Sequence, residues 1–254
     1  MPIFGELDSA TRLHRCAEVT RLATADDAFD VADVDILTFT NEIDTRSAFT
    51  VIPKALHPSL PPYMTIIFRR HPDSRFGPLT TVEMNIRARS TIHQVGYTVA
   101  SFTDNPDATA WLRDQYGFPS RTAEIRCEQR YTGVVAEVSV AGETLFAGEL
   151  RTPHYISPTD VLFTPTLNLA LVDGQLKLVQ QELEYTLEKA ERGSAVISAF
   201  DAKALGEPAI ELTNPLPPTF VHAREVGYGS VRFLVDPERP AMSGTVDLEK
   251  KAAS

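Results

Sequence analysis

Residues 104–121 read DNPDATAWLRDQYGFPSR and carry the clearest structural signals in the chain. The opening Asp-Asn pair can cap the N-terminus of a helix, and Pro106 suits the first turn. Gly117 can adopt the left-handed conformation that commonly ends a helix. The pattern therefore predicts a short helix over residues 107–116, in a chain with few other helical signals.

The residues after this helix form a rigid corner. Pro119 fixes its own backbone and favours an extended conformation for Phe118. Ser120 and Arg121 follow directly and are therefore held in a defined position. Such a position suits a functional site, although an ordinary helix-to-strand turn with a surface arginine would read the same way.

Outside this helix, apolar residues mostly alternate with polar ones, which favours β-strands. Residues 168–182 place Asp173-Gly174 between two alternating runs, a strong hairpin signal. Residues 133–150 repeat the arrangement around Ala141-Gly142. Many hairpins and few helices predict an α+β fold that is mainly antiparallel β.

No repeat, low-complexity segment or linker divides the chain, so we expect a single domain over residues 1–254. Residues 1–30 would form an N-terminal arm, and residues 247–254 a flexible tail. A proline cluster at residues 215–218 is expected to precede the last strands.

The composition excludes several classes of function. The formal net charge of −10 disfavours nucleic-acid binding, because the phosphate backbone would be repelled. The chain has no run of about 18 apolar residues and no apolar signal segment near its N-terminus, so we expect no membrane partner. Two cysteines, Cys16 and Cys127, cannot build a disulfide scaffold in 254 residues, which favours a cytoplasmic protein. The histidine spacing gives no zinc signature and no nucleotide-binding motif is present, so we expect no metal and no cofactor.

One predicted strand has an unusual polar face. Within residues 81–89, Val82, Met84 and Ile86 share one face, and Glu83 lies among polar residues on the other. This second face is either an ordinary solvated surface or the wall of a polar pocket in which Glu83 acts as an acid or base. Periodicity leaves both interpretations open.

The stretch 104–121 resembles the most diagnostic segment of the acetoacetate decarboxylase superfamily. That segment runs from an Asp-Asn turn through a helix carrying Gly-Arg-Glu to aromatic-Pro-Lys-Lys; here the corresponding residues are 112–114 (Leu-Arg-Asp) and 118–121 (Phe-Pro-Ser-Arg). Residues 51–56 (VIPKAL) are similar to the family's Val-Val-Pro-x-x-Leu, and Glu83 takes the place of its pocket glutamate.

The resemblance covers roughly residues 36–235. It implies a cone-like barrel of antiparallel strands with a few peripheral helices, and a homo-oligomer. It also implies that Glu83, Arg113, Ser120 and Arg121 converge on one interior cavity. Phe118, together with Tyr97 or Met84, would supply part of the apolar wall.

The sequence departs from the family at the reactive position. The family's first lysine after aromatic-Pro forms an imine with the substrate ketone, and here that residue is Ser120, which cannot do so. The second is Arg121, which stays protonated. The family's N-terminal pocket arginine also has no clear counterpart. The residues that remain suit proton transfer beside a carbonyl: Glu83 as acid or base, Arg121 holding a carboxylate or enolate, and Ser120 donating to a carbonyl.

We therefore predict a lysine-independent lyase or isomerase acting on a small keto acid or polyketide-like carbonyl compound. Isomerisation, dehydration, cyclisation and C–C cleavage all remain open, as does a role in secondary metabolite biosynthesis. Two alternatives remain. One is a β-keto acid decarboxylase that uses another lysine; the other is a non-catalytic small-molecule-binding protein. The candidates for a relocated lysine are Lys54, Lys177, Lys189 and Lys203.

Overall fold

The computed structural model describes residues 3–90 and 93–252, the last two by their backbone alone. The outermost two residues of the predicted arm and of the predicted tail lie outside the described residues. The described strands, in chain order, are β1 (Ala17–Val19), β2 (Phe29–Ile43), β3 (His57–Pro58), β4 (Tyr63–Ser74), β5 (Gly77–Ser90), β6 (His93–Thr103), β7 (Ser120–Thr122), β8 (Glu124–Arg130), β9 (Gly133–Val140), β10 (Glu143–Ile156), β11 (Thr166–Val172), β12 (Gln175–Gln181), β13 (Leu183–Phe200), β14 (Leu212–Tyr228), β15 (Phe233–Val235) and β16 (Thr245–Asp247).

The helices are few and short. They are α1 (Thr45–Val51), α2 (Pro106–Tyr116), α3 (Ala241–Gly244) and α4 (Leu248–Ala252), with 3-10 turns η1 (Ser9–Arg15), η2 (Ala25–Asp27) and η3 (Pro158–Asp160). None of the described helices is long and apolar enough to cross a membrane.

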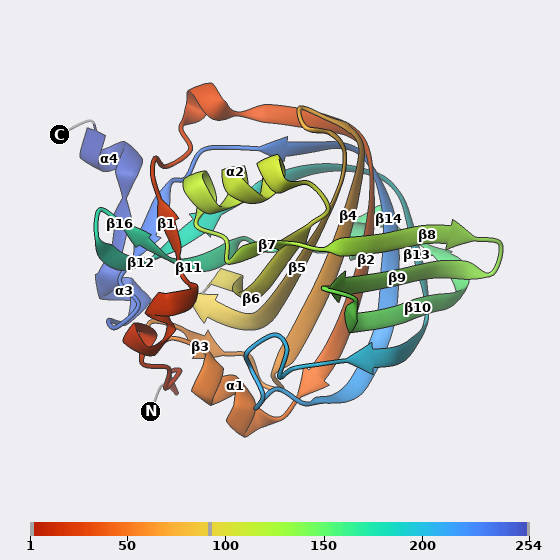
Figure 1. Ribbon diagram of the computed structural model, residues 1–254, viewed down its shortest axis with the longest axis horizontal. Helices are drawn as coiled ribbons and strands as arrows, with labels where there is room; N and C mark the ends of the chain where they lie inside the picture. The colour runs from red at the N-terminus through yellow and green to blue at the C-terminus, as the bar shows by residue number, and fades with distance from the viewer. Residues whose placement is uncertain (1–2, 91–92, 253–254) are drawn as a thin grey trace.

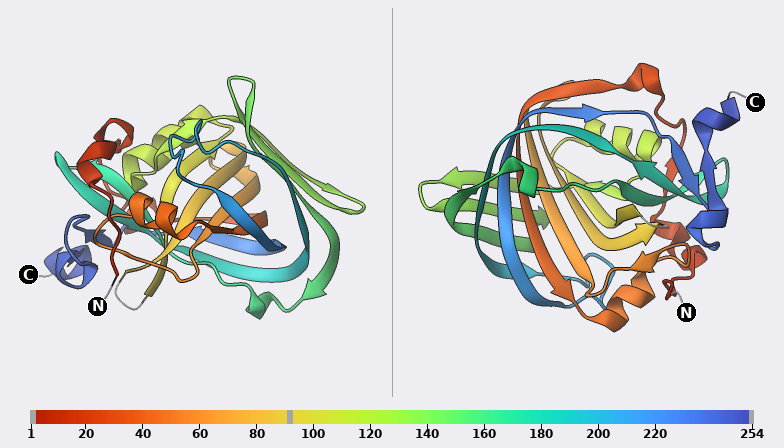
Figure 2. Two further views of the ribbon diagram at one scale, coloured as in Figure 1. Left: turned by 90° about the horizontal axis from the view of Figure 1, so that it is seen from below. Right: turned by 180° about the vertical axis from the view of Figure 1, so that it is seen from behind.

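All strands belong to one strongly curved sheet, which wraps around the interior of the molecule (Figures 1 and 2). The main path runs β16-β15-β12-β11-β6-β5-β4-β2-β14-β13-β10-β9-β8 and is mostly antiparallel. Short parallel pairs join β1 to β11, β11 to β6 and β6 to β7. The predicted fold class is confirmed.

Both predicted Gly-containing hairpins form. Asp173 and Gly174 connect β11 to β12, and Ala141 and Gly142 connect β9 to β10. All four residues have positive φ, between 50° and 81°. Two-residue turns of this kind match the right-handed twist of the flanking strands, so the dipeptides set the register of both hairpins.

The central strands are buried on both faces. One face of β2, β4 and β5 packs against β9, β10 and α1, in a core that contains Phe39, Phe68 and Phe146. The opposite face packs against α2 and β11, in a second core that contains Ile67 and Phe118. On the polar face of β5, Thr81, Glu83 and Asn85 are buried, and exposure returns only towards Arg87 and Arg89. Around Glu83 this face is therefore not an ordinary solvated surface.

The proline cluster does not end a strand. Pro215, Pro217 and Pro218 lie inside β14, where the pairing with β2 shifts register between Leu216 and Thr219. Proline lacks the N–H that a ladder needs, and a bulge leaves residues unpaired while the strand continues. The cluster therefore marks an irregularity within a long strand rather than a break before one.

The C-terminal segment lies against the sheet. β16 pairs with β15, Arg232 contacts Asp247 at 3.3 Å, and Leu248 packs on the second core. Within the described residues, the start of the predicted tail is thus held by strand pairing and by an apolar contact.

Candidate active site

Residues 104–121 form α2 and the corner that follows it. Helix α2 packs onto the sheet against β6 and β7 (Figure 1). The Asn105 side chain accepts hydrogen bonds from the amides of Asp107 (2.9 Å) and Ala108 (3.1 Å), as the sequence predicts for an N-cap. Gly117 ends the helix with φ of +68°. A Cβ at Gly117 would lie 2.6 Å from the Cβ of Ala170 on β11, so the close packing of this corner also requires glycine.

One row of side chains crosses four strands. Ile67 on β4 is paired with Glu83 on β5, Glu83 with Ser101 on β6, and Ser101 with Ser120 on β7. Residues directly opposite each other in neighbouring strands project to the same face. Glu83 and Ser120 therefore share a face, two strand spacings or roughly 10 Å apart. The Ser101 and Ser120 hydroxyls lie 3.4 Å apart.

Glu83 belongs to a buried polar network. Arg69 Nη1 donates to its carboxylate at 2.6 Å, and Asn85 Nδ2 donates to the other oxygen at 3.3 Å. Arg69 also donates to the hydroxyl of Tyr185 at 3.0 Å. Arg69 is 3% exposed and Glu83 is 6% exposed. Burial alone would lower the pKa of Arg69, but the neighbouring Glu83 charge raises it overall. Because a buried charge is costly without a partner, the two residues hold each other in place.

A second pair lies further along the same face. The Tyr228 hydroxyl and His71 Nε2 are 3.2 Å apart. Burial, reinforced by the charge of Arg69, lowers the pKa of His71 to about 3, so this histidine is neutral at physiological pH. In a neutral imidazole one ring nitrogen carries the proton and the other accepts, so the tautomer of His71 sets which group donates in this hydrogen bond.

Several buried polar atoms on this face have no hydrogen-bond partner among the described residues. They are Arg69 Nε, His71 Nδ1, Thr81 Oγ1 and Asn85 Oδ1. Buried polar groups in proteins are normally satisfied by protein, water or ligand. These four atoms can therefore donate hydrogen bonds to, or accept them from, water or a ligand.

A pocket of about 260 Å³ opens over this network. Its floor includes Arg69 and Asn85, and its walls include Arg87 from β5 and Arg192 from β13. Thr164 accepts a hydrogen bond from Arg87 at 2.9 Å. Among the described residues, neither Arg87 nor Arg192 has a carboxylate partner within 4.0 Å, and burial lowers the pKa of Arg87. Asp160 also lines the pocket, but among the described residues it makes no ion pair with either arginine. The pocket therefore offers two cations outside ion-pair distance of a carboxylate to an anionic ligand.

The structure brings some of the predicted site residues together. Ser120, which is 1% exposed, lies on the face of Glu83, and Arg113 donates to its carbonyl oxygen at 3.2 Å. Phe118 is buried in the second core, on the same side of the sheet. None of these three lines the pocket between Arg87 and Arg192, and neither does Glu83 itself. Ser120 and Phe118 lie further along the face, and Arg113 is on α2.

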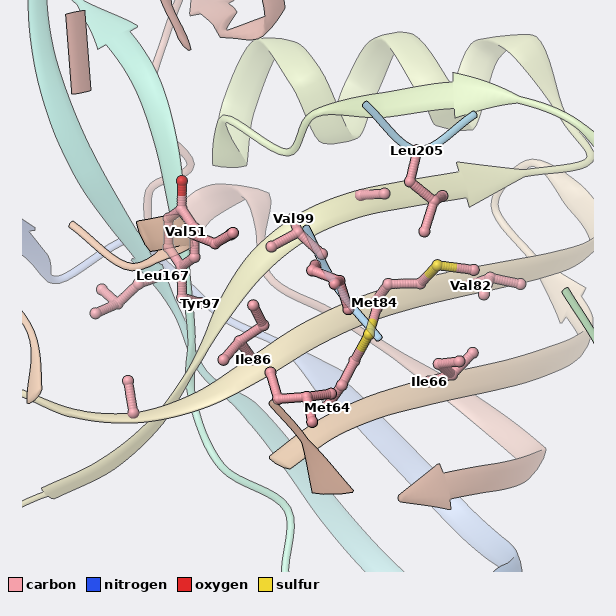
Figure 3. Close-up of a cluster of buried hydrophobic side chains, with 14 of the residues drawn as sticks. Val51, Met64, Ile66, Val82, Met84, Ile86, Tyr97, Val99, Leu167 and Leu205 are labelled. Atoms are coloured by element: carbon pink, nitrogen blue, oxygen red, sulfur yellow. The ribbon is translucent and has the colours of Figure 1, made fainter. Parts of the chain in front are cut away.

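The remaining predicted residues project to the opposite face. Arg121 is paired with Phe102 and lies over its ring, 5.0 Å from the centroid. Met84 and Tyr97 lie in the first apolar core, as Figure 3 shows. The cause is the period of a strand: Arg121 follows Ser120, and Met84 follows Glu83, so each points away from its neighbour. The expected convergence of Arg121 with Glu83 is thus absent from the structure.

Sequence reasoning missed most of the pocket's charged residues. Arg87 and Asn85 stood on the polar face of the predicted strand but were given no role. Arg69, Tyr185 and Arg192 come from strands whose alternation is ordinary. A pairing of the two strands around residues 69 and 83 would have revealed Arg69, but nothing in the sequence indicates that β13 returns over this face.

The candidate lysines lie elsewhere. Lys54 pairs with Glu238 at 2.7 Å, Lys189 and Lys203 are exposed, and Lys177 is half-buried on β12. No described lysine lines the pocket. In the part of the chain that the structure describes, no three His, Cys, Asp or Glu side chains gather as a metal site.

Comparison with solved structures shows the same fold in three enzymes. An acetoacetate decarboxylase from Legionella pneumophila subsp. pneumophila str. Philadelphia 1 superposes with a TM-score of 0.71 at 17% identity, over 82% of this chain and 86% of that one. The enduracididine biosynthesis enzyme MppR, complexed with the condensation product of pyruvate and imidazole 4-carboxaldehyde, gives 0.65 at 12% identity, over 79% and 87%. An acetoacetate decarboxylase-like enzyme from Sphingomonas wittichii RW1 gives 0.57 at 16% identity, over 80% and 91%.

No curated protein sequence matches the chain significantly. The family profile described as acetoacetate decarboxylase (ADC), however, matches residues 19–204, which is most of the chain and includes α2, Glu83 and the corner at Ser120. Sequence and fold thus agree, and the chain belongs to the acetoacetate decarboxylase family of enzymes.

Proposed function

We propose that this protein is a lysine-independent enzyme that transfers a proton beside the carbonyl group of a small carboxylate-bearing compound. The observation that carries the proposal is the pocket over the Arg69–Glu83 pair, with Arg87 and Arg192 free of acidic partners among the described residues. In a chain of net charge −10, two such arginines facing one pocket favour an anionic ligand.

Each residue has a defined role in this proposal. Arg87 and Arg192 hold the substrate carboxylate, and Asn85 and Arg69 lie on the floor near the carbonyl oxygen. Glu83 is not itself among the lining residues, but it contacts two of them, Arg69 and Asn85. In this proposal its carboxylate reaches the substrate between them, accepts a proton from the carbon next to the carbonyl and returns it to the same or a neighbouring carbon. Arg69 would stabilise the enolate oxygen that develops meanwhile. Such a step serves isomerisation, dehydration, cyclisation or C–C cleavage equally.

Ser120 and Arg113 have a supporting role in the proposal. Ser120 lies beside Ser101 in the row that contains Glu83, and Arg113 binds its backbone carbonyl. We assign the pair to the shape of the inner wall, with Phe118 as its apolar part. Arg121, Met84 and Tyr97 project from the opposite face of the sheet, where they pack against other side chains and stabilise the strands.

A second candidate function is ligand binding without catalysis. It is favoured by the fact that both oxygens of Glu83 already accept hydrogen bonds, one of them from a cation. A carboxylate held in this way also serves as the structural partner of a buried arginine. The two candidates differ in what they predict for Glu83.

The test is deuterium exchange at the carbons next to the carbonyl, followed by NMR in D₂O with a panel of 2-oxo and 3-oxo carboxylates. We expect exchange above the buffer rate for at least one compound, and a loss of roughly 100-fold or more in Glu83→Gln, which removes the base. Because this variant also leaves Arg69 buried without a charged partner, circular dichroism at the assay temperature is used to verify that it is folded. Arg87→Ala and Arg192→Ala should instead weaken binding of the same compound. Binding that survives in Glu83→Gln, with no exchange in either protein, would favour the binding protein.

We further propose a cytoplasmic homo-oligomer that works in specialised biosynthesis. The likeness in fold to an enduracididine biosynthesis enzyme supports the biosynthetic part. Since identity with that enzyme is 12%, its substrates are not transferred to this chain.

A further inference from the structure

Strand β8 is the last strand on the main path of the sheet. It pairs with β9 along one edge, and among the described residues no strand pairs with its other edge. The β8–β9 hairpin extends beyond the body of the molecule in both views (Figures 1 and 2), and Tyr131 at its tip is fully exposed. A free strand edge offers a row of backbone donors and acceptors to another strand.

The two faces of β8 differ. Its sequence is EIRCEQR, and the four charged residues Glu124, Arg126, Glu128 and Arg130 are all exposed. Ile125 and Cys127, on the other face, are half-buried and contact the first core. Free edges are commonly protected by charged side chains, especially lysine, or by proline. β8 has no lysine or proline, and its four exposed charges alternate in sign, so they repel a strand of matching charge pattern less than a row of one sign would.

This alternation is self-complementary about Cys127. When a strand pairs antiparallel with its own copy around a two-fold axis normal to the sheet, one residue lies opposite itself, because facing residues must share a face. Centred on Cys127, the pairing places Arg126 opposite Glu128 of the second copy, and Glu124 opposite Arg130. Each of the four charges then meets an opposite charge.

The neighbouring registers lack this property. Centred on Arg126, the pairing would oppose Arg126 to itself and Glu124 to Glu128. Centred on Glu128, it would oppose Glu128 to itself and Arg126 to Arg130. Like charges directly opposite in a sheet are destabilising, which disfavours both of these registers. Centring on Ile125 or Gln129 avoids like pairs but makes two opposite-charge contacts, whereas centring on Cys127 makes four, so the charges of β8 favour the register centred on Cys127.

We propose that β8 is a dimerisation edge, at which a second copy of this chain pairs antiparallel with Cys127 at the two-fold axis. The sheet then continues from β9 and β8 of one copy into β8 and β9 of the other. In this register Tyr131, just beyond the end of β8, lies opposite Ala123 of the second copy. The exposed tyrosine at the tip of the hairpin would then pack against the second copy. Arg126 contacts Glu128 of its own strand at 2.6 Å, and in the dimer both would reach across the axis as well.

The test is a charge swap, read by light scattering and by sedimentation at several protein concentrations. Arg126→Glu and Glu128→Arg each create two like-charge contacts across the axis, and each should weaken dimerisation by about tenfold or more. The double variant, which carries both substitutions, restores every opposite-charge pair and should dimerise as the unmodified chain does. Glu143→Arg, at the exposed β9–β10 turn, is the control for the change of net charge and should have no effect.

Dissociation in both single variants and recovery in the double variant would support the proposal. A monomeric unmodified chain at micromolar concentration would overturn it, and would leave the edge to a different protein. An oligomer whose mass is unchanged in both single variants would place the interface elsewhere and overturn it as well. Neither result bears on the exchange chemistry of the pocket, since β8 contributes no residue to it.

Discussion

At the scale of single residues, the pairing of Arg69 with Glu83 fixes what the pocket can do. The family resemblance leads one to expect a cation near Glu83, and the stretch around Val31–Val34, which aligns with the family's pocket arginine, has no arginine to supply it. In the structure, Arg69 from the neighbouring strand β4 supplies the charge from within the sheet. The pairing of β4 with β5 fixes the position of Arg69. The cation that pairs with Glu83 is therefore held by the sheet and not by a loop.

Removing Arg69 should therefore be costly. Arg69→Met leaves Glu83 buried without a cation and should lower the free energy of unfolding by about 3–5 kcal/mol. Urea unfolding measures the effect. The double variant Arg69→Met/Glu83→Gln removes both charges and should recover part of the loss. Arg151→Met breaks a pair with Glu149 in which Arg151 is exposed, and should cost at most about 1 kcal/mol. Equal losses in the two single variants would contradict a buried, mutually dependent pair.

Replacing Ser120 by lysine tests whether the loss of imine chemistry is due to this one position. Borohydride added with pyruvate should leave the mass of the unmodified chain unchanged, since no described lysine lines the pocket. In Ser120→Lys, a site that is 1% exposed should lower the pKa of the new amine by desolvation and favour its reactive form. Position 120 lies outside the pocket, so the longer lysine side chain must extend along the face of Glu83 to meet the ketone. We expect a trapped adduct in that variant alone, by mass spectrometry. An adduct on the unmodified chain, mapped to any lysine, would favour the relocated-lysine decarboxylase.

Residues on one strand could be predicted from the sequence, and contacts between strands could not. Alternation alone separates Glu83 from Met84 and indicates that Glu83 shares a face with Asn85 and Arg87. It also implies that Ser120 and Arg121 point to opposite faces, a consequence that the motif-based expectation overlooked. Arg192 reaches the pocket through pairings among distant strands, which leave no local mark in the sequence.

At the scale of elements, α2 and the tight hairpins were predictable because their signals are local. The caps of α2 and the left-handed dipeptides each act within a few residues. The proline cluster was misleading for the opposite reason. Whether it ends β14 or lies in a bulge depends on the register with β2, which is set over the whole length of both strands.

Gly117 offers a direct test of how α2 docks on the sheet. Gly117→Ala must adopt φ of +68° and also place a Cβ 2.6 Å from that of Ala170. Gly142 has φ of +81°, and no atom lies within 4 Å of the position that a Cβ would take there, so Gly142→Ala isolates the backbone cost, about 1–2 kcal/mol. We expect Gly117→Ala to lose roughly 1–3 kcal/mol more, by denaturant unfolding, because of overpacking. Similar losses would show that the corner has room to relax.

At the scale of the whole molecule, the buried polar face should make stability depend on pH. His71 is 1% exposed, and its pKa is lowered to about 3 by burial and by the charge of Arg69. An unfolded histidine has a pKa of about 6.5. Between these values the unfolded chain binds a proton that the folded chain does not, so the free energy of unfolding falls as pH falls from about 6.5 towards 3.

The contribution of His71 to this pH dependence can be separated from the contributions of other titratable groups. The contribution of His71 approaches about 1.4 kcal/mol per pH unit below pH 6, and urea unfolding at pH 7, 6 and 5 measures the slope. His71→Gln should be less stable than the unmodified chain at pH 7, because Tyr228 loses its partner, yet should lose less stability on acidification. His93→Gln, at an exposed position on β6, should keep the original slope. An unchanged slope in His71→Gln would mean that the histidine is protonated within the fold, and the interior face would then carry a second cation beside Arg69.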